Sequence, residues 1–216
     1  AYLQQGEDEK AESVAEKVWS RDPHQVSFIA AFHMAAIPAR MAVERHDWKK
    51  AAELKPRTPD YLPWDASLWA EGLTWFARGL GSVHTDNLEM ANEAEEKLRT
   101  LRDKAKASGA DDMANYIEID HLILAGWMAH ANNENDKAIA LMQSATELED
   151  KTEKHPVTPG ALLPANEALG NLLLNLDRPA EALEAYKASD AIWPGRYNTL
   201  LGAARAADKA GDKLAA

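Results

Sequence analysis

The chain has 216 residues, of which 46% are hydrophobic and 27% charged, so it is long enough to bury a substantial core and has the composition of a globular protein. It contains no cysteine, which excludes disulfides, thiolate metal sites and cysteine nucleophiles, and no stretch of about 18 uncharged apolar residues, which excludes a membrane-spanning helix. Its net charge of -11 and the interleaving of Lys and Arg with acidic residues disfavour nucleic-acid binding, because a phosphate backbone is repelled by such a surface.

The hydrophobic spacing predicts a chain made of helices, and no segment has the alternating pattern of a strand. Gly6 separates the first two helices, and Pro23 follows the second, where a helix usually stops. Pro38 lies inside a later helix and is expected to kink or split it, because proline lacks the N–H that a helix interior needs. In chain order, the expected helices cover residues 1–5, 8–20, 25–45, 47–54, 66–84, 87–107, 111–132, 135–150, 162–176, 178–191 and 197–210.

Two connections are longer than a helix hairpin needs. The first, KPRTPDYLPWD, covers Lys55–Asp65 and shortens the helix before it. The second, EKHPVTPGALLPAN, covers Glu153–Asn166, and its prolines stiffen it. Two interpretations of the second connection remain open. It seals the extra length of the neighbouring helices, or it folds over a binding face and contributes a lip that includes His155 and Thr158.

A repeated pattern links the helices in pairs. In each pair, a turn residue stands five positions before an alanine of the second helix. The turn residues are Gly, Asn, Asp or His, the types that best accept the positive φ with which a chain leaves a helix, so each is expected in the left-handed region. The six pairs are Gly6 and Ala11, His46 and Ala51, Asp86 and Ala91, Asn133 and Ala138, Asp177 and Ala182, and Gly211 and Ala216.

A second small residue stands seven positions before each of the later turns: Ala39, Gly79, Gly126, Gly170 and Ala204. Glycine inside a helix costs about 1 kcal/mol relative to alanine. The glycines in this column therefore indicate that two helices approach closely there, which compensates for the cost.

These columns resemble the tetratricopeptide repeat, a helix-turn-helix unit, with the best agreement at Leu169, Gly170, Ala182, Tyr186 and Pro194. The resemblance implies an all-α, right-handed solenoid of about five helix pairs that covers residues 1–216 as a single domain. The first residue falls inside the first helix of one repeat and the last falls early in the second helix of another. We therefore expect a fragment of a longer protein, incomplete at both ends, whose exposed repeat ends offer a surface for self-association.

A narrower resemblance covers nearly the whole chain. The segments that carry it look like the C-terminal part of larger bacterial tetratricopeptide proteins: AYLQQGEDEKAE, AAIPARMAVERHDWKKAAEL, LTWFARGLGSVHTDNLEMA and EKHPVTPGALLPANEALGNLLLNLDRPAEALEAYKASDAIWPGRYNTLLGAARAADKAGD. Members of this group are generally uncharacterised and often look exported. The resemblance therefore implies an exported or periplasmic location as one alternative and leaves the cytoplasm as the other. The histidine-rich segments that lie upstream in those proteins have no counterpart in this sequence, so no chemistry is transferred from them.

In a solenoid of this kind the first helix of each pair lines the concave face. The repeat frame places aromatic, amide and charged side chains on that face, which suits a peptide or a small polar ligand held against an aromatic wall. The alternative is an ordinary solvated face. The candidate groove residues are His33, Arg40, Glu44, Phe76, His84, Asp120, Trp127, His130, Glu167, Asn171, Asn175 and Arg205. Trp64, Trp69 and Trp75 form a further aromatic group that either closes a small satellite core or adds a binding wall.

The sequence offers little for metal or catalytic chemistry. His84 and His130 lie near the ends of neighbouring first helices and could converge, but no HxxxH or HExxH pair occurs. No GxSxG nucleophile elbow and no phosphate-binding glycine loop is found either. We therefore expect neither a cofactor nor catalytic residues.

The function expected from the sequence is a non-catalytic scaffold that binds a protein or peptide in its concave groove. A small-molecule-binding or metal-binding repeat protein is the alternative, and an accessory domain of an enzyme is a third. A deep open groove would favour a peptide, whereas a closed pocket under residues 55–65 or 153–166 would favour a small ligand.

Overall fold

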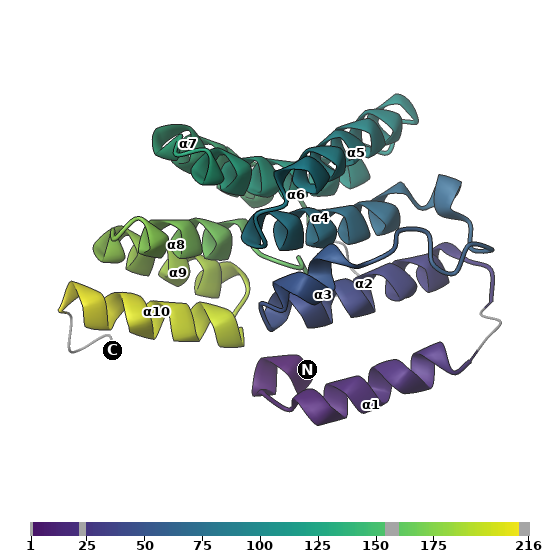
Figure 1. The fold of residues 1–216 in the computed structure, drawn as a ribbon, viewed down its shortest axis with the longest axis horizontal. Helices are drawn as coiled ribbons and strands as arrows, with labels where there is room; N and C mark the ends of the chain where they lie inside the picture. The colour runs from purple at the N-terminus through teal and green to yellow at the C-terminus, as the bar shows by residue number, and fades with distance from the viewer. Residues whose placement is uncertain (1, 22–24, 154–159, 212–216) are drawn as a thin grey trace.

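The computed structural model describes residues 2–21, 25–153 and 160–211, and this part of the chain is helical and contains no strand (Figure 1). None of its helices is both long enough and apolar enough to span a lipid bilayer. His155 and Thr158 lie outside the described residues. The described elements are η1 (Tyr2–Gln5), α1 (Asp8–Trp19), α2 (Phe28–Glu44), α3 (Trp48–Ala52), η2 (Trp64–Ala66), α4 (Leu68–His84), α5 (Leu88–Ala107), α6 (Asp111–Ala131), α7 (Asn135–Lys151), α8 (Ala165–Asn175), α9 (Pro179–Ile192) and α10 (Tyr197–Ala210), where η denotes a 3-10 helix.

The helix positions agree with the sequence prediction to within three residues at most ends. The helix expected from residue 162 begins instead at Ala165, because Leu162 and Leu163 are buried in a non-helical approach to α8. Pro38 lies inside α2, which continues to Glu44 and is not split.

The turn residues predicted from the repeat pattern all have a left-handed backbone, which confirms that prediction. Their φ angles are 73° at Gly6, 53° at His46, 59° at Asp86, 63° at Asn133, 55° at Asp177 and 77° at Gly211. The turns at Asp86, Asn133 and Asp177 reverse the chain so that the second helix packs back on the first, α5 on α4, α7 on α6 and α9 on α8 (Figure 1).

The glycines of the small-residue column lie against neighbouring helices, as predicted. A Cβ atom at Gly79 of α4 would lie 2.5 Å from a methyl carbon of Leu124 on α6 and 3.1 Å from Cβ of Ala94 on α5. A Cβ atom at Gly126 of α6 would lie 3.3 Å from the carbonyl oxygen of Ala138 on α7. Larger residues at these positions would force the helices apart.

Helix α4 lies at the centre of the core, and this position corrects one candidate groove residue. Because α4 packs against α2, α3, α5 and α6, most of its side chains are buried. Phe76 is completely buried, so its ring does not face an open groove. Trp64, Trp69 and Trp75 belong to the same large core cluster and do not close a separate satellite core.

Residues 160–163, which lead into α8, occupy part of the space between α2 and α10. Arg40 of α2 donates hydrogen bonds to the carbonyl oxygens of Gly160 and Ala161, at 2.5 and 3.0 Å. Leu162 and Leu163 are buried.

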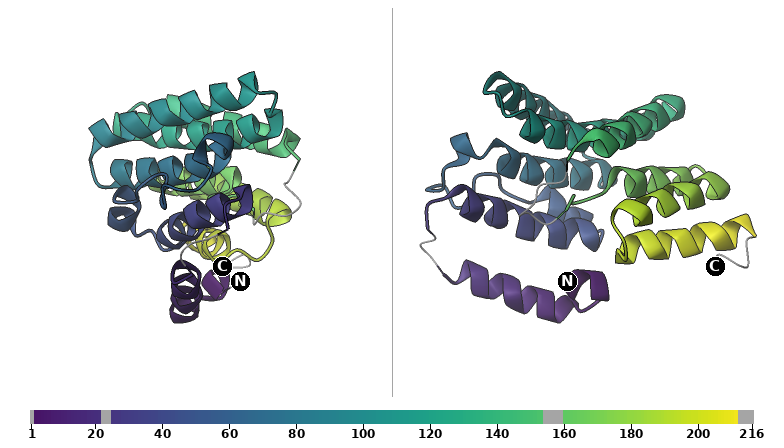
Figure 2. Two further views of the ribbon diagram at one scale, coloured as in Figure 1. Left: turned by 90° about the vertical axis from the view of Figure 1, so that its right-hand side faces the viewer. Right: turned by 180° about the vertical axis from the view of Figure 1, so that it is seen from behind.

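At the chain's start, the side-chain oxygen of Gln4 accepts a hydrogen bond of 2.8 Å from the backbone N–H of Tyr197, so η1 lies beside the start of α10 (Figures 1 and 2). Segments from the two ends of the sequence therefore meet.

Candidate functional site

A cluster of buried charges joins segments that are far apart in the sequence. Arg196, in the turn before α10, donates one hydrogen bond to Glu44 at the end of α2 and one to Glu167 in the first turn of α8, each at 2.9 Å. The hydroxyl of Thr199 also donates to Glu167, and a nitrogen of Arg40 lies 3.6 Å from the Glu44 carboxylate. Two carboxylates and two guanidinium groups thus balance one another where Glu44 and Glu167 are almost completely buried.

Neutral polar groups complete this charge cluster. Gln4 donates a hydrogen bond of 2.7 Å to the Glu44 carboxylate, and the amide of Asn198 donates one of 2.9 Å to the Glu44 carbonyl oxygen. Burial alone would lower the pKa of Arg196, but Glu167 and Glu44 outweigh burial, so the pKa of Arg196 is raised. The cluster holds η1, α2, α8 and α10 together, and a cavity lies on each side of it.

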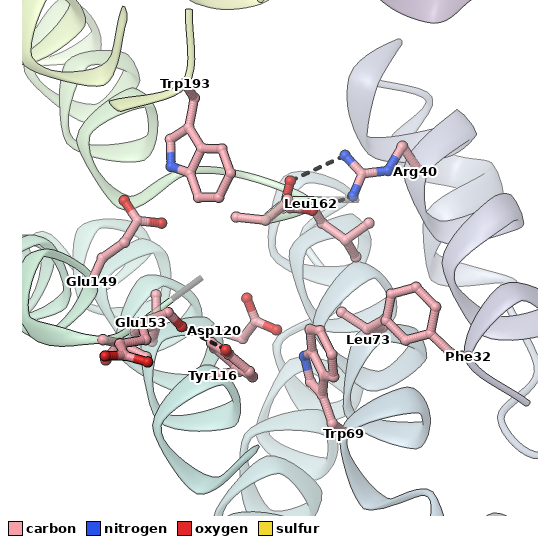
Figure 3. Close-up of a pocket in the computed structure, with 14 residues that line it drawn as sticks. Phe32, Arg40, Trp69, Leu73, Tyr116, Asp120, Glu149, Glu153, Leu162 and Trp193 are labelled. Carbon is pink, nitrogen blue, oxygen red and sulfur yellow. Dashed lines mark hydrogen bonds between the residues drawn. The ribbon is translucent and has the colours of Figure 1, made fainter. Parts of the chain in front are cut away.

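The first cavity, which we call the aromatic–acidic cavity, has a volume of about 220 Å³. Its apolar walls are formed by side chains from α2, α4, α6 and the segments before α8 and α10: Phe32, Trp69, Leu73, Tyr116, Leu162 and Trp193 (Figure 3). Its polar side chains are Arg40, Asp120, Glu149, Thr152 and Glu153. The cavity therefore combines aromatic surface with three carboxyl groups, from α6 and from the end of α7 and the residues that follow it.

The second cavity, which we call the ring-stack cavity, has a volume of about 350 Å³. One wall is a series of rings, in which Trp48 stacks between His46 and His84 with centroid distances of 5.0 and 4.2 Å. Trp127 of α6 continues the series at 4.8 Å from His84, and His130 lies 5.9 Å beyond it. The series brings together the turn after α2 and the C-terminal ends of α4 and α6.

The opposite wall of the ring-stack cavity consists of amides and a guanidinium group. Asn171 and Asn175 come from α8, and Asn198 and Arg205 come from α10. The Asn171 side-chain oxygen accepts a hydrogen bond of 2.7 Å from the hydroxyl of Tyr186. Among the described residues, no hydrogen-bond or ion-pair partner is found for three groups on this wall. They are the side-chain NH₂ of Asn171, the side-chain NH₂ of Asn175 and the guanidinium of Arg205. This wall is therefore rich in unused donors.

The two cavities share a wall made by consecutive residues of the second long connection. Leu162 lines the aromatic–acidic cavity and Leu163 lines the ring-stack cavity. Gly160 allows this path, because a Cβ atom there would overlap the ring of Trp193. The described end of the connection thus reaches the interior.

Burial keeps histidines of the ring stack neutral. It lowers the pKa of His84 to about 4, and nearby His46 and His130 add to the effect. Burial also lowers the pKa of His46, where Glu167 opposes the shift and Arg205 reinforces it. At neutral pH the positive charge at this cavity therefore comes from Arg205, not from the His46 and His84 rings.

Replacing His84 with Phe is expected to flatten the pH dependence of stability between about pH 6.5 and pH 4. Because His84 takes up its proton more readily in the unfolded chain, the wild-type protein loses stability as the pH falls through this window, by roughly 3 kcal/mol. Phe preserves a ring beside Trp48 and does not titrate. Urea denaturation at several pH values measures the effect, and parallel pH profiles for the two proteins would contradict it.

Apart from Phe76, which is in the core, and the lip residues His155 and Thr158, which lie outside the described residues, the candidate residues predicted from the sequence fall into four groups. Arg40 and Asp120 line the aromatic–acidic cavity, and Glu44 and Glu167 belong to the charge cluster. His33 is exposed with its ring edge against Phe32 and lines neither cavity. The residues that line the ring-stack cavity are His84, Trp127, Asn171, Asn175 and Arg205, with His130 at the end of the ring series.

Several residues important to the site were not among the candidates. Arg196 lies in the turn before α10, outside the helical frame on which the prediction was based. Trp193, the residue that follows α9, lines the aromatic–acidic cavity. Phe32 and Tyr116 also line that cavity from α2 and α6. Their helical periodicity indicates burial but does not separate a cavity wall from a filled core.

Among the described residues, no group of three or more His, Asp or Glu side chains is arranged to hold a metal ion. Neither a scan of protein-family models nor searches of curated proteins and of solved structures finds a match to this chain. Arguments about function therefore rest on the geometry of the two cavities.

Proposed function

We propose that this chain is a non-catalytic helical-repeat scaffold that binds a protein or peptide, and that the ring-stack cavity receives a carboxylate of that partner. The observation that supports this proposal best is the guanidinium of Arg205, which is exposed, has no partner among the described residues, and lines the same cavity as the amide groups of Asn171 and Asn175. Guanidinium and amide donors match the acceptor oxygens of a carboxylate. The rings of the opposite wall suit an apolar or aromatic side chain next to it.

The proposal includes a tetratricopeptide-like, right-handed solenoid as the architecture. In that arrangement, the first helices α2, α4, α6, α8 and α10 line the inner side, and they contribute many of the side chains of both cavities. The left-handed turn residues and the contacts of α4 with both α2 and α6 support it. The cavity beside α8 and α10 would then be one part of a longer binding surface.

Replacing Arg205 with Gln is expected to weaken peptide binding by about 10- to 100-fold, the usual effect of losing a hydrogen bond between charged groups. The probe is a library of random short peptides with a free C-terminal carboxylate, screened for binders by fluorescence polarisation. Each binder is then tested again with its C-terminus amidated, which should weaken binding by a similar factor.

The matched control is Lys209→Gln, which removes one positive charge from the same helix. Lys209 lies 3.7 Å from Asp177 and does not line the cavity, so this change should leave affinity within about twofold. Equal losses in the two variants would indicate a general charge effect. A library without binders, or binders indifferent to Arg205, would contradict the proposed function.

A further inference from the structure

The aromatic–acidic cavity contains a buried carboxyl group without a partner. Asp120 is 6% exposed, and it forms neither a hydrogen bond nor an ion pair with any described residue. Its carboxyl group points from α6 into the cavity, between the Trp69 ring and the Glu149 side chain (Figure 3). Buried carboxyl groups are normally paired, so an unpaired one that faces a cavity indicates a ligand.

The other charges at this cavity favour a cation. Glu149 and Glu153 add two further carboxyl groups to the lining. The guanidinium of Arg40 is already hydrogen-bonded to the Gly160 and Ala161 carbonyl oxygens and lies beside Glu44. The positive charge on the lining is thus engaged elsewhere, whereas the Asp120 carboxyl remains available.

The apolar walls of the cavity also restrict which cation it can hold. Trp69, Tyr116 and Trp193 present aromatic surface within the cavity, and such rings attract ammonium groups through their negative faces. A cavity of roughly 150 Å³ accommodates benzene. The volume of about 220 Å³ is therefore enough for a ring or a short alkyl chain that carries an amine.

We propose that the aromatic–acidic cavity binds a small organic cation, a primary or secondary ammonium group joined to one apolar ring or alkyl chain, with the ammonium group on Asp120. This site is separate from the carboxylate site proposed at Arg205, and it does not depend on that proposal. It gives a chemical class to the small-molecule alternative expected from the sequence.

Proton release accompanies this binding. When the cavity holds no ligand, burial raises the pKa of the Asp120 carboxyl group well above its usual range, and Glu149 adds to the shift while Arg40 opposes it. An ammonium group favours the ionised carboxylate, so at a pH below this raised pKa Asp120 gives its proton to the buffer when the amine binds. The observed enthalpy of binding should then depend on the ionisation enthalpy of the buffer.

Isothermal titration calorimetry with 2-phenylethylamine and hexylamine tests the proposal, with 2-phenylethanol, hexanol and 3-phenylpropanoate as neutral and anionic counterparts. We expect the amines to bind at least about tenfold more tightly than the alcohols and the carboxylate not to bind. Alcohols that bind as tightly as the amines, or amines that do not bind, would overturn it.

Asp120→Asn preserves the shape of the side chain and removes its charge. It should weaken amine binding by about 10- to 100-fold, abolish the buffer dependence and leave alcohol binding unchanged, since the alcohols do not require the charge. Asp112→Asn, at an exposed position in the first turn of the same helix, is the matched control and should bind amines like the wild type. Equal affinity of the Asp120→Asn and wild-type proteins for amines would overturn the proposal.

Discussion

Replacing Glu44 with Ala is expected to lower the free energy of unfolding by about 3–5 kcal/mol, because it leaves a buried guanidinium group short of a carboxylate partner. Glu44 is 3% exposed, and its carboxylate accepts hydrogen bonds from Arg196, Gln4 and Asn198. The total stability of a domain is only about 5–15 kcal/mol, so this loss is large. Urea denaturation followed by circular dichroism measures it.

The matched control is Glu181→Ala. Glu181 forms an exposed ion pair with Arg178, and removal of such a surface pair should change stability little, because solvent screens the two charges. Hydrogen exchange adds a local measurement, because loss of Glu44 should weaken protection in η1 and at the start of α10 before it affects α5. Equal effects of the two substitutions would show that the buried charge cluster adds no more stability than a surface pair.

The helices and their turns could be predicted because both depend on local chemistry. His46, Asp86, Asn133 and Asp177 all have positive φ, and few residue types other than glycine accept that conformation. A turn residue at a fixed distance from an alanine therefore marks a helix pair without any knowledge of the tertiary structure. The same logic identified the close helix contact at Gly126, where the neighbouring carbonyl oxygen belongs to Ala138.

The charge cluster could not be predicted, because its members are distant in the sequence and one lies outside a helix. Glu44 and Arg196 are 152 positions apart. The repeat frame placed Glu44 and Glu167 on one face but had no position for Arg196, which lies between α9 and α10. A rule based on helical periodicity cannot describe a turn residue that reaches across the molecule.

Only part of the candidate site could be predicted, because the repeat frame describes positions on helices and not what surrounds them. Asn171, Asn175 and Arg205 occupy equivalent inner positions of α8 and α10, and the structure brings them to one cavity. Phe76 fits the same frame, yet it is core, because α4 has helices on most of its sides. The frame gives the direction of a side chain, but the surrounding helices decide whether that direction leads to solvent, to a cavity or to the core.

Replacing Gly81 with Ala is expected to destabilise the protein by about 3 kcal/mol, the upper end of the usual range for overpacking. A Cβ atom at this position of α4 would lie 2.5 Å from the carbonyl oxygen of Trp48 and 2.8 Å from Cβ of Ala51, and it would also meet the backbone nitrogen of Ala52. Backbone atoms cannot move aside as a flexible side chain does, so α3 as a whole must shift. Thermal and urea denaturation measure the loss.

Gly72 on the same helix provides the matched control, because a Cβ atom there would lie 3.4 Å from a side-chain carbon of Ile117, an ordinary contact. Gly72→Ala should leave stability unchanged or raise it by up to about 1 kcal/mol, since alanine favours the helix. The two substitutions are chemically identical, so a difference in the sign of the stability change isolates the contact between α4 and α3.

Displacement of α3 should also separate the Trp48 ring from the His84 ring, which stack at 4.2 Å. Any Gly81→Ala protein that remains folded should therefore bind peptide more weakly at the ring-stack cavity. Similar stability changes in the two variants would show that α3 yields easily, and its close approach to Gly81 would then not be what positions the Trp48 ring.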